Sequence, residues 1–455
     1  MRSLRWLPWL AASLVVAVYL PALSASFQFD DWQVVLGDPR VASIAAWWES
    51  MPGMRALVKL TYALNHALGA QVESFRALNI VLHACNTAMV FVLVRGLSRR
   101  LRTADAGGAG MVAAVTALIF ALHPVQTESV TYIAARSNLI AAFFSLLGLL
   151  AWQRGRQKQQ AWPWWLLSAL CYVAALAGKE TAAVLPLVML LCLAAERSFT
   201  RRDLLFPAAL VLLLGALLAL LWPWLPYDYL LRTSLETRGP LQNLLTQTEG
   251  VGWLVGQLWR WDLLNADPML APVVTFTTGT ALRAGVLIAA LAAGVLSLRR
   301  LPALGFGILW FFLWLAPTNS LLARLDVAND RQLYLALVGP GWCVAHLFLQ
   351  LRARAWMATL LFAIVLAAGT WTRNRVYQTE TGFWQDVTAK SPHNARAWNN
   401  LGMSLAAACD SFGAAEAFRQ ASHLAPVDAL PQVNLALLEQ GELEVARDCP
   451  DQPLP

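Results

Sequence analysis

The sequence predicts an all-α membrane protein that crosses the bilayer many times. Of its 455 residues, 58% are apolar and only 13% are charged, whereas soluble domains average about 25% charged residues. Apolar runs of roughly 18 residues recur along the chain, and each is long enough to cross a hydrocarbon core of about 30 Å. The 21 Trp residues suit the aromatic belts of the two membrane interfaces. We therefore expect about 11 transmembrane helices.

Basic residues between the apolar runs predict the topology. They cluster in every second short connection, which the positive-inside rule places in the cytoplasm together with the N-terminus. The net charge of +7 is therefore assigned to topology, and no nucleic-acid partner is expected. The clusters are Arg2 and Arg5; Arg95, Arg99, Arg100 and Arg102; Arg154, Arg156 and Lys158; Arg197, Arg201 and Arg202; Arg299 and Arg300; and Arg352 and Arg354.

Two stretches leave the topology open. The alternation of charge holds only if residues 251–264 do not cross the membrane, so we interpret this half-apolar stretch as an interfacial or re-entrant helix. The first apolar run, residues 7–23, has small residues after it, and a cleaved signal peptide is the alternative to a first span.

The chain divides into three parts. Residues 1–371 form the transmembrane domain, residues 372–394 a linker, and residues 395–455 a soluble extracytoplasmic region. The first domain should contain two external regions, 24–74 and 223–278, and a Gly-rich connection at 106–110. Short interfacial helices are expected within the first external loop, at 44–48 and 57–68.

The C-terminal region predicts a short tetratricopeptide-repeat cap. Two amphipathic helices, 395–402 and 414–426, carry seven residues at the consensus positions of one 34-residue repeat: Trp398, Leu401, Gly402, Ala414, Phe418, Ala421 and Pro426. A second repeat begins near Ala429 and breaks off. A protein partner could bind this cap. Cys409 and Cys449 could form a disulfide if the region is extracytoplasmic.

The most informative candidate site is the acidic pair Asp30–Asp31, which directly follows the first apolar run. Carboxylates cost several kcal/mol at a bilayer centre, so they should lie at its surface or line a wet cavity. There a carboxylate can take the proton of an acceptor hydroxyl, or hold a divalent cation such as Mg²⁺ or Mn²⁺ against a phosphate. An N-cap or a solvated loop start is the structural alternative.

A polar patch interrupts the third apolar run. His123, Glu128 and Arg136 follow one another closely at membrane depth. We interpret His123 and Glu128 as facing the Asp30–Asp31 loop, where they would bind substrate together with Arg136, or would serve with Asp30 and Asp31 as the ligands of a metal. A histidine that merely stabilises a helix C-terminus is the alternative.

Charged residues at two other external connections suit a phosphate. Lys179–Glu180 lies between the fifth and sixth runs, and Arg331 precedes the tenth. Lysine and arginine are the cations that proteins use for phosphate. Snorkelling and interfacial anchoring are the ordinary alternatives. The absence of a Gly-rich phosphate loop and of a Ser/His/Asp set argues against a nucleotide enzyme and a serine hydrolase.

Several motifs together resemble a known family. In order along the chain they are Phe29-Asp30-Asp31, His123-Pro124-Val125-Gln126-Thr127-Glu128 with Arg136, Lys179-Glu180-Thr181, Arg331 with Leu333-Tyr334-Leu335, and Arg373-Asn374, Trp384 and Pro392-His393-Asn394-Ala395. The chain thus resembles the transmembrane and tetratricopeptide-repeat-containing O-mannosyltransferases and their bacterial relatives in the GT-C glycosyltransferase superfamily.

The resemblance implies a GT-C fold, a polyprenyl-phosphate-linked sugar donor and transfer with inversion. It implies that Asp30 or Asp31 is the base and that Lys179 and Arg331 steady the leaving lipid phosphate. Two positions depart from the animal members, which have a second histidine at Gln126 and an acidic residue at Asn138. Their repeat array is also much longer, so neither mannose nor the acceptor carries over.

We therefore expect a multi-pass glycosyltransferase of the bacterial inner membrane, surrounded by membrane lipids, with its repeat and active face in the periplasm. The acceptor would be a protein or an envelope glycan. Two alternatives stay open: a non-catalytic scaffold that assembles partners through its repeat, and a polytopic transporter or lipid flippase. Transporters commonly show internal repeats with broken helices in both halves, and no such symmetry is visible in this sequence.

Overall fold

The computed structural model describes residues 6–196, 199–446 and 449, and within these residues every regular element is helical. The predicted positions Arg2, Arg5 and Arg197 lie outside this part of the chain. The α-helices are α1 Leu7–Tyr19, α2 Ile44–Glu49, α3 Ala56–Ala67, α4 Val72–Arg100, α5 Ala106–Leu122, α6 Thr127–Thr131, α7 Arg136–Gly155, α8 Trp162–Gly178, α9 Leu185–Glu196, α10 Arg201–Leu221, α11 Tyr227–Thr237, α12 Pro240–Gly256, α13 Thr278–Arg300, α14 Pro302–Leu315, α15 Leu333–Ala336, α16 Val338–Leu349, α17 Ala355–Val376, α18 Glu380–Lys390, α19 Ala395–Ala407, α20 Ser411–Leu424 and α21 Leu430–Glu439.

Five helices are long and apolar enough to cross a membrane by themselves: α4, α7 with the turn before it, α10, α13 and α17 with the turn before it. Two bent pairs raise this number to seven if each is one span: α5 with α6, bent by 51°, and α15 with α16, bent by 57°. Every apolar run of the sequence is helical, but the others are shorter. The chain is therefore a multi-pass membrane protein, and the count of about 11 spans stays a prediction.

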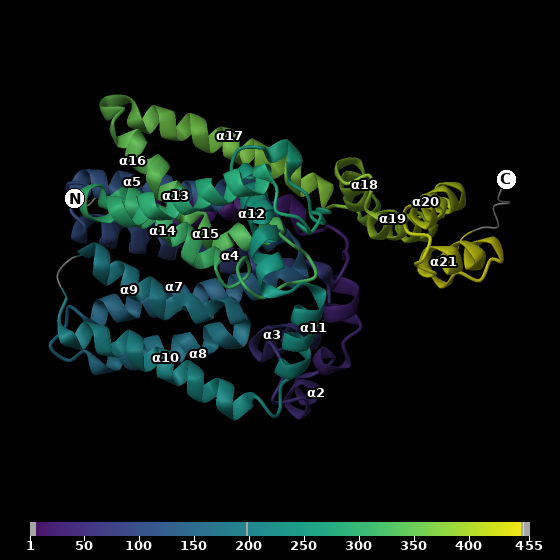
Figure 1. The fold of residues 1–455 in the computed structure, drawn as a ribbon, viewed down its shortest axis with the longest axis horizontal. Helices are drawn as coiled ribbons and strands as arrows, with labels where there is room; N and C mark the ends of the chain where they lie inside the picture. Colours follow the sequence, from purple (N-terminus) through teal and green to yellow (C-terminus); the bar gives the residue numbers. More distant parts are fainter. Residues whose placement is uncertain (1–5, 197–198, 447–448, 450–455) are drawn as a thin grey trace.

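The long helices run side by side and form a bundle with two distinct ends (Figure 1). The helices α2, α3 and α11 of the two predicted external regions lie at one end, from which α18–α21 project. Residues 251–264 lie at this end too, where α12 stops at Gly256 and a turn follows at Trp261–Leu263. That stretch is not among the candidate membrane spans found in the described residues.

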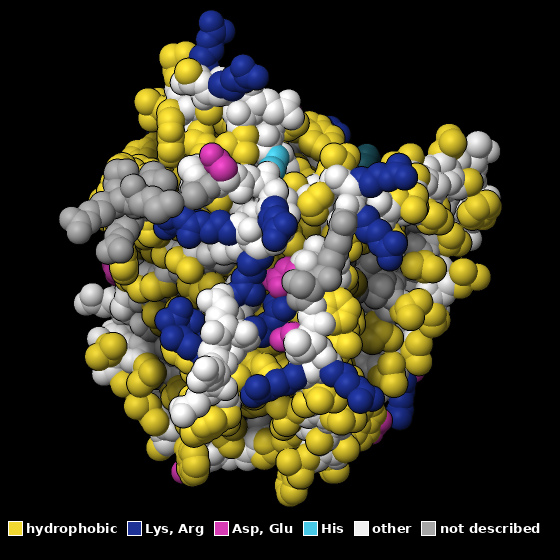
Figure 2. Space-filling model, turned by 90° about the vertical axis from the view of Figure 1, so that its left-hand side faces the viewer, with side chains coloured by type: hydrophobic (Ala, Val, Ile, Leu, Met, Phe, Trp, Pro, Cys, Tyr) yellow, Lys and Arg dark blue, Asp and Glu magenta, His cyan; other side chains and the backbone are white. Residues whose placement is uncertain are grey.

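The opposite end carries the predicted basic connections. Figure 2 faces this end and shows Lys and Arg side chains spread across it, with few acidic ones. The exposed residues there include Arg99, Arg102, Arg154, Lys158, Arg201, Arg202, Arg299, Arg300, Arg352 and Arg354. The basic clusters therefore share one end of the bundle, as the positive-inside pattern requires.

Local chemistry changes two of the predicted boundaries. Residues 106–110, expected as a Gly-rich connection, form the first turns of α5, because the Asp105 carboxylate caps that helix by accepting from the Gly108 amide at 2.6 Å. The predicted linker 372–394 is also mostly helical. It holds the end of α17 and all of α18, whose apolar Phe383, Trp384 and Val387 are buried. The two short helices expected in the first external loop are confirmed as α2 and α3.

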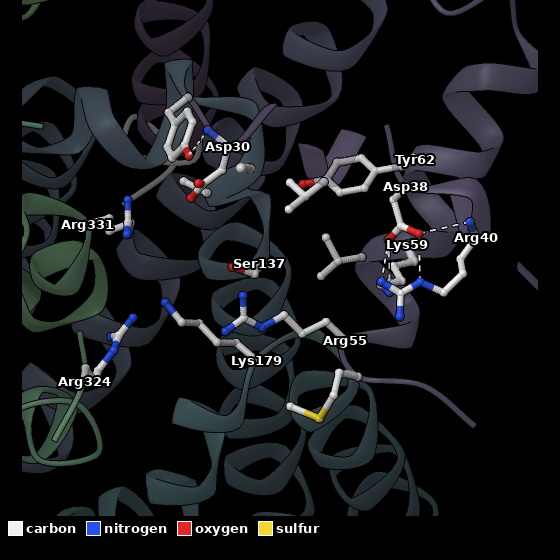
Figure 3. A pocket seen from close by; sticks show the side chains of 16 residues that line it. Asp30, Asp38, Arg40, Arg55, Lys59, Tyr62, Ser137, Lys179, Arg324 and Arg331 are labelled. Carbon is white, nitrogen blue, oxygen red and sulfur yellow. Dashed lines mark hydrogen bonds and ion pairs between the residues drawn. The ribbon is translucent and has the colours of Figure 1, made fainter. Parts of the chain in front are cut away.

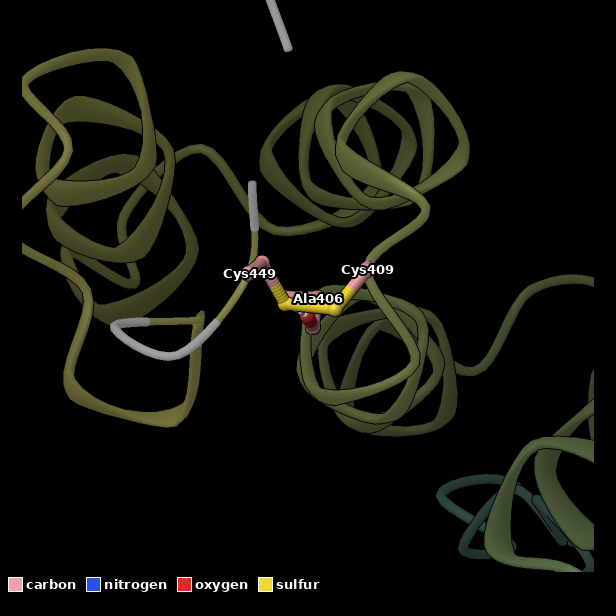
Figure 4. The surroundings of a disulfide bond; sticks show 3 residues. All are labelled: Ala406, Cys409 and Cys449. Carbon is pink, nitrogen blue, oxygen red and sulfur yellow. Dashed lines mark hydrogen bonds between the residues drawn. A yellow bond between two sulfur atoms is a disulfide. The ribbon is translucent and has the colours of Figure 1, made fainter. Parts of the chain in front are cut away.

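The C-terminal helices pack as a layered unit. Helices α19 and α20 lie against each other, and a side chain at Gly402 would overlap the Phe418 ring, so glycine is needed at this crossing. Cys409 and Cys449 form a disulfide with Cα atoms 5.4 Å apart, which ties the last described residue to the end of α19 (Figure 4). This packing agrees with the predicted register, and the assignment as a tetratricopeptide repeat stays a prediction.

Candidate functional site

A pocket of about 280 Å³ opens at the end of the bundle where α2, α3 and α11 lie. Its walls come from the first external loop, from α3, from the start of α7 and from the connections after α8 and α14. Figure 3 shows the charged side chains around it. Two of them are acidic and six are basic: Asp30 and Asp38; Arg40, Arg55, Lys59, Lys179, Arg324 and Arg331.

Asp30 is the member of the acidic pair that lines the pocket. Its backbone N–H donates to the Tyr132 hydroxyl at 3.1 Å. The preceding Phe29 has φ = 49°, a left-handed conformation that costs a non-glycine residue of order 1–3 kcal/mol. The Phe29 ring is held between Tyr132 and Trp384, with centroid distances of 6.5 and 5.2 Å. Packing thus enforces the turn that presents the Asp30 carboxylate.

Asp31 has a different environment and is buried. Its Oδ1 accepts from the Ala134 amide at 2.7 Å and its Oδ2 from the Gln28 amide at 3.2 Å. Burial raises the pKa of Asp31 to about 7, although these hydrogen bonds and the nearby Arg76 favour the charged form. Because Oδ1 joins this loop to the turn before α7 and Oδ2 closes a turn within the loop itself, we assign Asp31 a structural role.

Two cations of the pocket have no acidic partner within the described residues. Lys179 is 4% exposed, and its Nζ donates only to the amide oxygen of Asn138. Burial lowers the pKa of Lys179 well below its ordinary value, and the charges of Arg324 and Arg55 lower it further. Arg324 is half-buried, and its pKa falls to about 10 through burial and the charges of Arg331 and Arg55. An anion in the pocket would relieve both groups.

Arg331 is positioned by Glu128. The two oxygens of the Glu128 carboxylate accept from the Arg331 backbone amide at 2.7 Å and from its Nη1 at 2.8 Å. Glu128 is buried and does not line the pocket, whereas the Arg331 side chain does. Glu128 therefore fixes an arginine that faces the substrate space. Glu180, also outside the lining, pairs at 3.4 Å with the partly exposed Arg55.

The far wall of the pocket is largely neutralised. The Asp38 carboxylate accepts from Arg40 Nε at 2.8 Å and lies 3.2 Å from Lys59 Nζ. Burial raises the pKa of Asp38, but the hydrogen bonds from Arg40 and Lys59 outweigh it and lower the pKa overall. Since Arg331 is paired with Glu128, the pocket cations with no carboxylate partner among the described residues are Lys179 and Arg324, on the opposite side.

The expectation that His123 and Glu128 face the Asp30–Asp31 loop is wrong. His123 Nε2 donates to the Leu258 carbonyl at 3.0 Å, its Nδ1 accepts from the Val125 amide at 3.2 Å, and its ring packs on Trp261. The imidazole therefore ties the bend after α5 to the segment after α12. Glu128 faces Arg331 instead, as described above.

Arg136 is likewise internal and lies outside the pocket lining. Its guanidinium donates to Asn79 Oδ1, Thr61 Oγ1, Asn65 Oδ1 and the Phe75 carbonyl, at 2.8–2.9 Å. It thereby joins α7 to α3 and α4, and all of these acceptors are neutral. A substrate-binding role for Arg136 would require this set of bonds to open.

The four predicted metal ligands do not converge. Asp30 faces the pocket, whereas Asp31, His123 and Glu128 are each bonded elsewhere. Within the described part of the chain, no three His, Cys, Asp or Glu side chains come together as a group that could hold a metal ion. These residues therefore do not fit a divalent cation, and we derive no step through one.

Sequence reasoning named only Asp30, Lys179 and Arg331 among the residues that line the pocket, and it missed Arg55, Arg324 and Tyr132, among others. Arg324 carried a usable signal, because it lies in a connection expected on the non-cytoplasmic side, where the positive-inside rule disfavours basic residues. Arg55 also lies in an external loop, and it begins α3 with φ = 53°. Basic residues in loops that the predicted topology places outside the cytoplasm therefore indicated the position of the pocket.

Fold and site define a class: an α-helical multi-pass membrane protein with a cation-rich pocket at one end of its bundle. Comparison with known protein sequences shows which proteins this chain is similar to. The chain is 30% identical over 191 residues to protein O-mannosyl-transferase TMTC2 of Mus musculus, which covers 37% of this chain and 22% of that protein. It is 22% identical over an alignment of 495 residues to protein O-mannosyl-transferase TMTC3 of Homo sapiens, covering 94% and 52%.

A third relative, protein O-mannosyl-transferase F38B6.6 of Caenorhabditis elegans, is 21% identical over an alignment of 442 residues. The protein is thus a relative of the TMTC-type protein O-mannosyl-transferases. It spans about half the length of the relatives that it matches over most of its chain, with 52% and 59% of those proteins covered. No family model matches the chain, and no solved structure matches it significantly.

Proposed function

We propose that this protein is a membrane glycosyltransferase that transfers a sugar from a polyprenyl-phosphate donor to a hydroxyl group of a protein or an envelope glycan. One observation carries the proposal: a single pocket combines a carboxylate that can act as a base, Asp30, with two cations that have no acidic partner among the described residues, the buried Lys179 and the half-buried Arg324. The names of the relatives support the same class of reaction.

In the proposed reaction, the acceptor oxygen attacks the anomeric carbon while Asp30 takes the hydroxyl proton. The bond between that carbon and the phosphate oxygen breaks, and the leaving phosphate keeps the electron pair. Lys179, Arg324 and Arg331 surround the growing negative charge with donors that are already in place. Attack from the side opposite the leaving group inverts the anomeric configuration, as in GT-C enzymes, whose fold and roughly 11 spans we also propose here.

We place the pocket on the periplasmic side of a bacterial inner membrane and the basic end in the cytoplasm. The exposed Arg and Lys of the opposite end support this orientation. The disulfide Cys409–Cys449 supports it too, because such bonds persist in oxidising compartments. The helices α19–α21 would then form a periplasmic tetratricopeptide-type cap, open to a protein partner, next to the catalytic loop.

The test is lipid analysis of a deletion strain complemented with wild type, Asp30→Asn or Asp31→Asn. We expect a polyprenyl-phosphate sugar to accumulate in the deletion and in Asp30→Asn but not in wild type, and its mass would identify the donor sugar. Asp31→Asn should complement, because an amide oxygen can still accept from Ala134. Full complementation by Asp30→Asn would contradict the proposal and favour a scaffold. Lipid translocation by the purified protein without sugar transfer would favour a transporter.

A further inference from the structure

A small annex adjoins the main pocket and shares two of its cations. The annex encloses about 30 Å³ and is lined by Asn138, Lys179, Trp314, Arg331 and Gln332, among others. Lys179 and Arg331 line both spaces, so the annex lies directly behind the cationic wall that Asp30 faces. We use the word annex for this space and these five residues.

Three side chains of the annex have buried polar atoms without a partner. Asn138 Nδ2, Trp314 Nε1, and both Gln332 Nε2 and Gln332 Oε1 make no hydrogen bond within the described residues. The three residues are only 9%, 6% and 7% exposed, respectively. Leaving a buried donor unpaired costs about 1–3 kcal/mol, so folded proteins rarely tolerate several in one place unless a ligand or water pairs with them.

The chemistry of these atoms selects a phosphate. Three of the four unpaired atoms are N–H donors, two cations stand beside them, and no carboxylate lines the annex. Such a set suits a group that presents several negatively charged acceptor oxygens. Space for one water takes about 10–15 Å³, so the annex is too small for a sugar ring and suits one tetrahedral group.

We propose that the annex binds the single phosphate of a polyprenyl monophosphate, with Gln332, Asn138 and Trp314 as donors that supplement Lys179 and Arg331. This inference rests on the proposed function and adds to it the residues that hold the leaving group. The sugar then lies in the main pocket beside Asp30, and the scissile bond crosses the boundary marked by Lys179 and Arg331. Asn138 has two tasks: its oxygen orients Lys179, and its free NH₂ group faces the phosphate.

The test measures binding of farnesyl monophosphate and of inorganic phosphate to the full chain in lipid nanodiscs. Gln332→Met should weaken farnesyl monophosphate about tenfold, because one hydrogen bond to a charged group is lost. Asn138→Leu should weaken it at least as much, because this change removes both the NH₂ donor and the oxygen that orients Lys179. The matched control is Gln153→Met: Gln153 is also buried with an unpaired Nε2, but it lies at the basic end, and this variant should bind like wild type.

The outcomes separate the two proposals. If both annex variants bind farnesyl monophosphate like wild type while Lys179→Ala does not, the annex assignment is overturned and the proposed function stands. If inorganic phosphate binds as tightly as the lipid and responds equally to the variants, the annex is a free-phosphate site and the lipid assignment fails. If wild type binds no farnesyl monophosphate, both proposals fail. A thermal melt of each variant identifies any that are misfolded, and Asn138→Leu and Gln332→Met act as independent tests.

Discussion

Two groups of buried cations lie at opposite ends of the bundle and differ in how they are paired. At the basic end, Arg156 is 8% exposed and contacts two carboxylates, with Nη1 2.7 Å from Glu196 and Nε 2.9 Å from Asp203. At the pocket end, the 4%-exposed Lys179 contacts only a neutral amide, and Arg324 has no acidic partner among the described residues. Each group thus contains cations withdrawn from solvent, but only Arg156 has carboxylate partners among the described residues.

This difference in pairing distinguishes cations that stabilise the fold from cations that are available to bind a ligand. A buried charge costs several kcal/mol unless a partner compensates it, and Arg156 has its partners within the chain. Lys179 and Arg324 are left in an unfavourable state that an anionic substrate would correct. Uncompensated charges of this kind are expected where stability is given up for function.

The largest predicted effects are a loss of stability from a substitution at the basic end and a rise in donor KM from a substitution at the pocket end. Arg156→Gln should lower the free energy of unfolding by about 1.5–3 kcal/mol, because Glu196 and Asp203 lose their shared partner while Glu196 keeps Arg100, and should leave the donor KM unchanged. Arg324→Gln should raise the donor KM at least about tenfold, because a positive charge of the pocket beside the leaving phosphate is lost, and should leave stability equal or higher. Thermal unfolding and donor kinetics measure the two quantities.

Arg102→Gln serves as a surface control for this comparison. Arg102 is exposed at the basic end and forms no ion pair with the described residues, so neither quantity should change measurably. The comparison breaks if Arg324→Gln destabilises the protein as Arg156→Gln does, because Arg324 would then have a structural partner.

The second prediction concerns the pH dependence of donor binding, which we assign to Lys179 at the pocket end. Burial and neighbouring arginines lower the pKa of Lys179, so the empty pocket loses this proton at a pH below that of an ordinary lysine. A bound phosphate favours the ammonium form. Donor binding should therefore take up a proton, and the donor KM should rise as pH rises through the lowered pKa. Lys179→Arg should flatten this rise, because a guanidinium stays charged.

Calorimetry in buffers of different ionisation enthalpy measures the proton uptake directly. Wild type should take up protons on binding farnesyl monophosphate at alkaline pH, and Lys179→Arg should take up fewer. Equal uptake by the two proteins would assign the titration to another group and remove Lys179 from the set of substrate-binding cations.

A third, smaller effect is expected from the tail. Arg396 of α19 contacts the buried Asp267 and lies 3.1 Å from Asp326, which is itself 4.0 Å from Arg331. The same guanidinium lies over the Phe29 ring at 5.6 Å. Arg396→Gln should therefore lower kcat by up to about tenfold through misplacement of Arg331 and Phe29, with little change in donor KM. Arg419→Gln, which removes only an exposed pair in the same unit, should have no effect.

Much of this architecture could be predicted from local sequence pattern. The apolar runs, the basic connections, α2, α3 and the α19–α20 pair all follow from periodicity and charge, which act over a few residues. The acidic pair, Lys179 and Arg331 also stand out in the sequence and line or adjoin one pocket. What was missed depends on contacts between distant segments. The hydrogen bond from the Ala134 amide holds Asp31 in the interior and leaves Asp30 to face the pocket. The hydrogen bond to the Leu258 carbonyl gives His123 a structural role.

The annex shows the same limit. Asn138, Trp314 and Gln332 belong to three separated segments, and none is unusual in its own sequence context. Their importance lies in unpaired polar atoms that meet in one small space, which no spacing rule reveals. Arg324 and Arg55, which line the main pocket, differ from these residues, because a basic residue on the non-cytoplasmic side of the predicted topology is a signal that the sequence itself contains.

The last prediction applies the comparison to the acidic pair, in which Asp31 is the buried, structural member. The pKa of Asp31 is raised from an ordinary 3.8 to about 7. Between these values the folded protein holds a proton that the unfolded chain has released, so wild-type stability should fall as pH rises from about 4 to about 7 and then level off. Asp31→Asn carries no such proton and should lose this slope, so that its melting temperature exceeds that of wild type at pH 8 relative to pH 5.

The matched control for this slope is the neighbouring carboxylate. An Asp30→Asn variant melted at the same two pH values should follow wild type, because Asp31 is intact. If the pH dependence instead disappears in Asp30→Asn and persists in Asp31→Asn, then Asp30 is the buried structural carboxylate, and the base proposed for the transfer reaction must be reassigned to Asp31.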